Sequence, residues 1–95
     1  MKILAIEREI GKVDWSQHQQ VLRDEAAAAY QLYKAGIVRE MYFNEAHSAV
    51  LCLECESRDM AFGFISQLPI VKAGLVAFDI MELNPYTGYE RLMQL

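Results

Sequence analysis

Six segments along the chain follow one of two hydrophobic patterns, one typical of strands and the other typical of helices. Runs rich in β-branched and aromatic residues, bounded by turn residues, predict four strands: 2–8, 37–43, 49–55 and 75–83. Segments 17–35 and 58–68 have the composition and periodicity of helices. Gly36 follows the first helix as a C-terminal signal, and Pro69 follows the second as a stop. The predicted order is therefore β-α-β-β-α-β.

Each predicted helix has a capping residue and one apolar stripe. Asp14 or Ser16 is suited to accept hydrogen bonds from the free amides that begin the first helix, and Ser57 is suited to do so for the second. Apolar or small residues spaced three to four apart predict the face that each helix buries. These are Leu22, Ala26, Ala29 and Tyr33 in the first helix, and Met60, Phe64 and Leu68 in the second.

This order, in a chain of 95 residues, is the α+β ferredoxin-like pattern of a single domain. Two βαβ-like halves joined by a hairpin form an antiparallel sheet that carries both helices on one face. We expect residues 1–84 to form this unit. We expect residues 85–95 to be a C-terminal tail that packs on the unit or on a partner subunit.

The sheet face turned away from the helices is predicted to be apolar. Side chains alternate between the two faces along a strand. Alternation gives the helix side Ile37, Arg39, Met41 and Phe43 from the second strand, and Ala49, Leu51, Leu53 and Cys55 from the third. It gives the far side Val38, Tyr42, Val50 and Cys52. Because such a face is too apolar for water, we expect a homodimer that stacks two sheets; whether dimers assemble further is left open.

Cys52 and Cys55 form a CxxC motif inside a predicted strand. Residues three apart on a strand point to opposite faces, and their Cα atoms are about 10 Å apart. A disulfide needs Cα atoms within roughly 7 Å, so the pair is not expected to bond. A zinc site would need two further ligands, and no second CxxC or spaced histidine pair is present. We interpret both cysteines as small strand hydrophobes and expect no metal site.

Composition narrows the classes of function. Hydrophobic residues make up 54% of the chain and charged residues 23%, which is typical of a folded domain. The net charge of −4 argues against sequence-independent nucleic-acid binding, which requires a basic patch. The apolar runs are too short to span a membrane. The first residues lack the long apolar core of a signal peptide, so a cytoplasmic location is expected.

Arg39, Glu54, Asp79 and His47 are the first candidates for chemistry. Moving a proton between carbons needs an acid and a base near one substrate, together with a group that stabilises the anion. Arg39 is the candidate that binds a substrate carboxylate; the alternative is an ion pair with a neighbouring acid. Glu54 and Asp79, acids within apolar strands, and His47 in the hairpin loop are the catalytic candidates. For the two acids the alternative is an interface bond, and for His47 it is a surface position.

Three further residues are candidates for binding substrate. His18 and Glu25 lie seven apart on the first helix, on the same side as Leu22, which would direct them to the rim of a cavity between helix and sheet. Tyr42 is the third candidate, and burial in the core or at an interface is its alternative. The alternative for His18 and Glu25 is an ordinary solvated helix surface.

Three motifs resemble the muconolactone isomerase-like family of the dimeric α/β-barrel superfamily. They are "YKAGIVREMYF" after the first helix, "ISQLP" at the end of the second, and "GLVAFDIMEL" in the last strand. The resemblance implies ferredoxin-like protomers paired through their sheets into a barrel. It also implies an isomerase that moves a proton within a small ring. The sequence contains no glycine-rich phosphate loop and no nucleophile elbow, so the chemistry expected is free of cofactors.

Two functions of different classes follow from these patterns. The first is a cofactor-free enzyme that performs acid–base chemistry on a small carboxylated or cyclic metabolite. The second is a non-catalytic module for small-molecule binding or assembly, in which the sheet face serves only to form a dimer. A hollow space between helices and sheet would favour the enzyme, and a fully packed space would favour the module.

Overall fold

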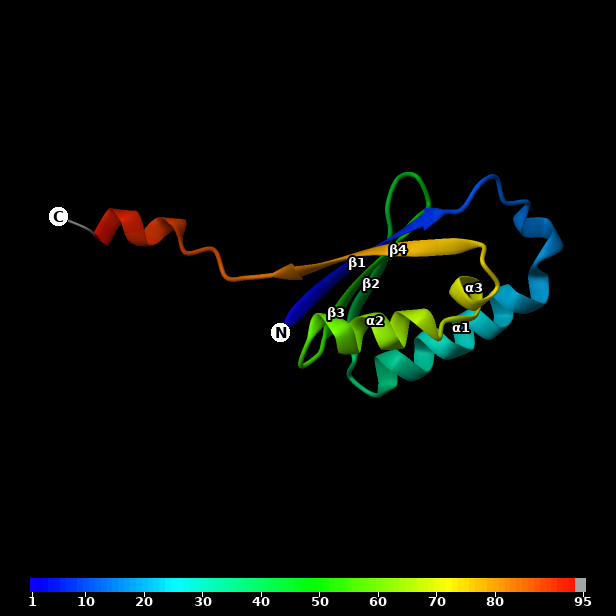
Figure 1. Cartoon of the computed structure of the whole chain (residues 1–95), viewed down its shortest axis with the longest axis horizontal. Helices are drawn as coiled ribbons and strands as arrows, with labels where there is room; N and C mark the ends of the chain where they lie inside the picture. Colours follow the sequence, from blue (N-terminus) through cyan, green and yellow to red (C-terminus); the bar gives the residue numbers. More distant parts are fainter. Residues whose placement is uncertain (94–95) are drawn as a thin grey trace.

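The computed structural model describes residues 1–93 and confirms the predicted order of elements (Figure 1). The strands are β1 (Lys2–Glu9), β2 (Val38–Phe43), β3 (Ala49–Glu54) and β4 (Val76–Leu83). The helices are α1 (Gln19–Lys34), α2 (Arg58–Ser66) and α3 (Pro69–Lys72). Two 3-10 turns accompany them, η1 (Trp15–Gln17) and η2 (Gly88–Met93). No helix among these residues is long and apolar enough to cross a membrane.

The four strands form one antiparallel sheet in the order β2-β3-β1-β4, which is the ferredoxin-like topology. The helices lie on one side of this sheet (Figure 1). The register pairs Ile3 with Leu53 and Ala5 with Leu51, so the apolar positions of the two central strands share the helix side. Both predicted features of the sheet, its antiparallel pairing and its single covered face, are therefore confirmed.

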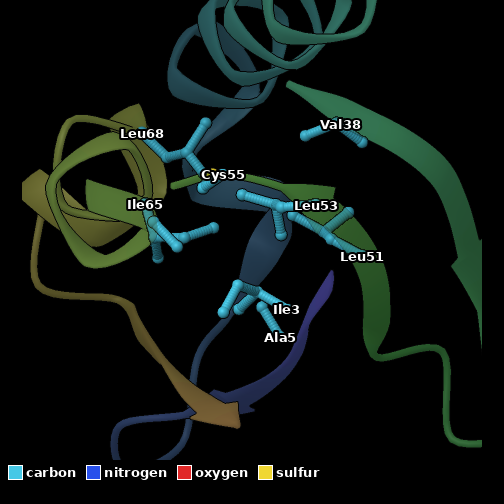
Figure 2. Close-up of a cluster of buried hydrophobic side chains, with 9 residues drawn as sticks. Ile3, Ala5, Val38, Leu51, Leu53, Cys55, Ile65 and Leu68 are labelled. Atoms are coloured by element: carbon cyan, nitrogen blue, oxygen red, sulfur yellow. The ribbon is translucent and has the colours of Figure 1, made fainter. Parts of the chain in front are cut away.

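The core lies between the central strands and α2 (Figure 2). Ile3, Leu53 and Val38 are at most 1% exposed, and Ile65 of α2 packs against them. Cys55 is buried in this cluster, whereas Cys52 lies on the far face opposite Leu4. Burial raises the pKa of the Cys55 thiol. The two cysteines are free and point to opposite faces, as predicted.

The start of α1 differs from the prediction. Asp14 accepts a hydrogen bond from the Ser16 amide, but this bond caps η1 and not the long helix. His18 occupies the N-cap position of α1 and makes no side-chain capping bond. The prediction that Asp14 or Ser16 caps this helix is therefore wrong, because Asp14 caps, and Ser16 belongs to, an additional 3-10 turn that precedes α1. Ser57 caps α2 as predicted, accepting from the Met60 amide at 3.0 Å.

The predicted buried faces of the two helices are confirmed only in part. In α1, Leu22 and Tyr33 are 38% and 52% exposed, and the residues that pack on the core are Ala28 and Leu32, one position earlier. In the second predicted helix, Met60 is 43% exposed, whereas Phe64 packs on the core and Leu68 is 2% exposed, as predicted. The buried stripe of that helix is Ala61, Ile65 and Leu68. In α1 the prediction fails most clearly at Tyr33, because small residues such as alanine do not fix which neighbouring position turns toward the core.

A β-bulge changes the face of Val38. The pairing of β2 with β3 shifts between Val38 and Glu40, which leaves Arg39 as the extra residue. Val38 therefore lies opposite Leu53 on the helix side and is 1% exposed. The prediction that Val38 lies on the far face is wrong, because simple alternation does not hold across a bulge.

Pro69 begins a helix in addition to ending one. It occupies the first turn of α3, where proline loses no hydrogen bond, and Leu68 is the N-cap. Ile70, the next residue, is 4% exposed. The stop at Pro69 was predicted, but the short helix after it was not, because four residues carry too little periodicity to be recognised.

The C-terminal arm, residues 84–93, extends away from the domain (Figure 1). Its large side chains are exposed, with Tyr86 at 77%, Tyr89 at 55% and Leu92 at 81%. The predicted tail ran over 85–95, of which residues 94–95 lie outside the described residues. Over the described part, the arm does not pack on its own domain, which leaves packing on a partner as the remaining prediction.

The open face of the sheet, turned away from the helices, is largely apolar in its middle, where Glu40 lies opposite Cys52 on the edge strand, and it is charged at its ends. The register places Leu4, Ile6, Tyr42, Val50, Cys52 and Met81 on this face. At one end, Arg8 donates to Asp79 at 3.1 Å. At the other, the N-terminal ammonium of Met1 pairs with Glu54 at 2.8 Å. The apolar character predicted from Tyr42, Val50 and Cys52 is therefore confirmed.

Candidate functional site

A cavity of about 860 Å³ lies between α1 and the sheet, at the end where β2 and β3 join in a hairpin. Residues of α1, β1, β2, β3, α3 and β4 all reach it. Its apolar wall includes Leu22, Ala29, Met41, Phe43, Leu51 and Phe78. A volume of this size is within the range of pockets that hold small molecules. We name it the helix–sheet cavity.

Small residues on α1 account for the empty space. Ala26 and Ala29 face the cavity from α1, where longer side chains would fill it. Met41 and Phe43 occupy helix-side positions of β2, opposite Leu51 and Ala49, yet they are 40% and 64% exposed. The part of the sheet under this end of α1 is therefore hollow, while the part under α2 is packed.

Three glutamates line the helix–sheet cavity, and each has one carboxylate oxygen bonded to the protein. Glu7 accepts from the Ala49 amide at 2.9 Å. Glu9 accepts from Trp15 Nε1 at 2.8 Å, and Glu25 accepts from the Ile70 amide at 3.1 Å. A carboxylate can accept several hydrogen bonds. Each of these glutamates therefore keeps capacity to accept bonds from a ligand.

The surroundings of Glu25 shift the pKa of its carboxyl. Burial raises the pKa of its carboxyl above the ordinary value of 4.5, and the negative charge of Glu7 raises it further. The hydrogen bond from the Ile70 amide opposes both effects but is smaller than the effect of burial. A carboxyl with a raised pKa is able to exchange a proton with a substrate closer to neutral pH.

The hairpin loop places His47 at the edge of the cavity. Asn44 Oδ1 accepts from the amides of Ala46 and Ser48, which closes the turn. His47 has a φ of 59°, in the left-handed region, and its ring stacks on Phe43 with centroids 4.1 Å apart. The loop therefore holds His47 in one orientation although it is exposed to solvent.

Of the predicted site residues, the structure brings Glu25 and His47 together around the cavity; Tyr42 borders it, but the register places its side chain on the open face of the sheet. Tyr42 lies on the edge strand, and its hydroxyl donates to Glu40 at 2.8 Å, which raises the pKa of the phenol. His18 lies at the start of α1 and is not part of the cavity lining. Its ring contacts the Trp15 ring edge-on, with the ring centroids 6.4 Å apart.

Arg39, Glu54 and Asp79 lie away from the cavity. Arg39 donates from Nε to the Gly36 carbonyl at 2.5 Å, at the other end of β2. Glu54 pairs with the Met1 ammonium, and this bond lowers the pKa of its carboxyl. Asp79 pairs with Arg8 on the open face. The structure therefore does not bring the two strand acids together with His47 or Glu25.

Glu7, Glu9 and Trp15 are cavity residues that the sequence reasoning missed. The available signal was the spacing of Glu7 and Glu9 on β1, because both continue the face that carries Ile3 and Ala5. Acidic residues on a core-facing row indicate a polar cavity at that end of the sheet. Among residues 1–93, no group of three or more His, Cys, Asp or Glu side chains is arranged to hold a metal ion.

Comparison with known proteins identifies the fold. No family model and no curated protein sequence matches the chain. The crystal structure of muconolactone isomerase is similar, with a TM-score of 0.75 and 16% identity over 92% of this chain and 92% of that chain. A complex of 5-chloro-2-hydroxyhydroquinone dehydrochlorinase from Burkholderia phenoliruptrix with 2,5-dihydroxybenzoquinone is also similar, with a TM-score of 0.65 and 19% identity over 88% and 94%. The chain therefore has the muconolactone isomerase-like fold that its sequence motifs predict.

Proposed function

We propose that this protein is an enzyme that performs acid–base chemistry, without a cofactor, on a small cyclic metabolite in the helix–sheet cavity. The observation that carries the proposal is Glu25, a partly buried carboxyl with a raised pKa that lines a cavity of about 860 Å³. An apolar cavity with a few convergent polar groups and a perturbed pKa is the arrangement expected of an active site. The two similar solved structures described above are those of enzymes named for small cyclic compounds.

The reaction proposed is the transfer of a proton between two carbons of the ring. A cavity carboxylate, Glu7 or Glu25, removes a proton from one carbon, and the electron pair of that bond shifts the neighbouring double bond. The proton is then returned to a carbon further along the ring, so the product is an isomer of the substrate. His47, at the cavity edge, is placed to assist the return of the proton.

We also propose that two protomers pair through the open face of the sheet. The middle of that face carries Leu4, Ile6 and Val50, which a second copy would remove from water. The charged pairs at the two ends of the face would form a polar rim. The C-terminal arm does not pack on its own domain, and we propose that it packs on the partner.

The experiment is an isomerase assay on an uncharged β,γ-unsaturated butenolide, followed by the ultraviolet absorbance of the conjugated product. Replacing Glu25 with Gln keeps an acceptor for the Ile70 amide and removes the proton-transfer group. We expect the rate to fall by roughly 100- to 10,000-fold. The control is Glu82→Gln, on an exposed glutamate outside the cavity, which should leave the rate unchanged. Equal rates in the wild type and Glu25→Gln would contradict the role of Glu25.

The second candidate is a non-catalytic binding or assembly module. One observation favours it: Glu7 and Glu25 both accept backbone amides, so the two carboxylates also serve to hold the hairpin and α3 in place. Under this alternative, Glu25→Gln would change stability alone, and the wild type would not accelerate the isomerisation. Ligand-dependent thermal shifts would then persist without turnover.

A further inference from the structure

The helix–sheet cavity is lined by three glutamates, Glu7, Glu9 and Glu25, and by no lysine or arginine of the described residues 1–93. Arg39, the residue expected to bind a carboxylate, makes its hydrogen bond to the Gly36 carbonyl outside the cavity. A substrate carboxylate placed here would lose water and gain no cation, which costs several kcal/mol in general.

The free acceptors of the cavity are spread around its wall. Glu7 and Glu9 extend from β1, and Glu25 extends from α1 on the opposite side. Within residues 1–93, no group of three or more His, Cys, Asp or Glu side chains is arranged to hold a metal ion. Acceptors that extend from both the sheet and the helix suit a ligand whose hydrogen-bond donors are distributed around a ring, and they suit a compact ammonium group less well.

The wall between these acceptors is apolar and partly aromatic. Phe43, Phe78 and Trp15 line the cavity, and His47 extends the stacked surface of Phe43. Trp15 Nε1 is already committed to Glu9, so it offers no donor to an anionic group. Such a wall favours a flat ring, because aromatic faces stack with one another.

From these observations we infer that the cavity selects an uncharged ring bearing two or more hydroxyl groups and rejects carboxylated rings of the same size. The inference rests on the proposed function only in taking the helix–sheet cavity as the site where the ligand binds. Each hydroxyl would donate to the unbonded oxygen of Glu7, Glu9 or Glu25, and the ring would lie against the apolar wall. The charge of the same oxygens would repel a ring carboxylate.

The test is isothermal titration at pH 7 with three matched probes: resorcinol, 3-hydroxybenzoate and 3-hydroxybenzylammonium. We expect resorcinol to bind at least about tenfold more tightly than 3-hydroxybenzoate. The reason is that the repulsion between like charges in a partly desolvated site exceeds about 1.4 kcal/mol, the free energy that corresponds to a tenfold difference in affinity. Equal or tighter binding of 3-hydroxybenzoate would overturn the inference. Tenfold tighter binding of the ammonium probe than of resorcinol would overturn it in favour of a cationic ligand, and no binding of any probe would also overturn it.

Two variants connect the selectivity to the cavity glutamates. Glu9→Gln removes a charge from the cavity and keeps an acceptor for Trp15 Nε1. It should reduce the preference for resorcinol over 3-hydroxybenzoate severalfold, and Glu82→Gln, outside the cavity, should leave the preference unchanged. A preference that is identical in Glu9→Gln and the wild type would count against the glutamates as its cause.

The outcome is independent of the outcome for catalysis. If hydroxylated rings bind selectively but the protein does not accelerate the butenolide isomerisation, the ligand class stands and the proposed acid–base function fails. If the isomerisation is accelerated but the carboxylated ring binds best, the function stands and the ligand class fails.

Discussion

At the scale of single residues, the protonation of Glu25 makes stability depend on pH. Its pKa in the folded protein lies above 4.5, so the folded state holds this proton more tightly than the unfolded chain does. The stabilising contribution is present in full below pH 4.5 and is lost as the pH rises through the raised pKa. We predict that Glu25→Gln, which stays neutral, is more stable than the wild type at pH 8 and equally stable near pH 4.

Urea unfolding of both proteins at the two pH values measures this difference. Gln retains an acceptor for the Ile70 amide, so the comparison isolates the charge. Glu82→Gln, at an exposed position, is the control for the loss of a negative charge in general. A wild type that matches Glu25→Gln at pH 8 would show that the carboxylate is not destabilised by burial.

The left-handed backbone of His47 yields a second prediction at this scale. Its φ of 59° is a conformation that costs ordinary residues about 1–2 kcal/mol and costs glycine almost nothing. His47→Gly and His47→Val both remove the ring stacked on Phe43. Both variants lose this ring stack equally. We therefore predict that His47→Val is less stable than His47→Gly by about 1–2 kcal/mol, as measured by urea unfolding. Equal stabilities would show that the loop adopts another conformation in solution.

At the scale of elements, the two sides of α2 differ strongly in their packing. Ile65 is 3% exposed within the core, whereas Phe62 is 61% exposed on the outer side of the same helix. We predict that Ile65→Ala lowers the free energy of unfolding by about 2–5 kcal/mol, and that Phe62→Ala changes it by roughly 0.5 kcal/mol or less. Chemical denaturation of the two variants measures both values. A larger loss from Phe62→Ala would indicate that the helix is rotated or that another subunit covers it.

Patterns over several residues predicted the fold well, because strand alternation and helix-forming segments are properties of whole elements. Leu51, Leu53 and Cys55 were assigned to the helix side, where they are buried. The bulge at Arg39 was not predictable, since a single inserted residue leaves the hydrophobic pattern of β2 almost unchanged. The face of α1 was predicted only in part: Leu22 and Ala29 do face the cavity, but Tyr33 is exposed, because the run of alanines fits more than one orientation.

The candidate site was predictable only in part, because it depends on how elements pack. Glu25 and His47 were named from the sequence and do line the cavity. Glu54 was named because an acid in an apolar strand looks buried, yet its side chain lies at the sheet end beside the Met1 ammonium. Glu7 and Glu9 reach the cavity only because α1 and the hairpin leave space above that end of β1.

At the scale of the whole molecule, two apolar surfaces have no partner within the described chain. They are the open face of the sheet and the C-terminal arm, which extends the molecule to 61 Å along its longest axis. The arm continues from the end of β4 and extends away from the domain (Figure 1). We propose that a second copy paired through the open face would also offer a surface to the arm.

The last prediction tests this assembly with two exposed apolar residues of the same domain. Met81, on the open face opposite Leu4, is 41% exposed, and Phe62, on the outer side of α2, is 61% exposed. In a dimer formed through the sheets, Met81→Glu places a buried, unpaired negative charge in the interface of both protomers. Phe62→Glu leaves its charge in water. We predict by light scattering that the wild type and Phe62→Glu have twice the 10.9 kDa chain mass and that Met81→Glu has the mass of one chain. A wild type with the mass of one chain, or a Met81→Glu variant that remains a dimer, would place any contact between copies elsewhere.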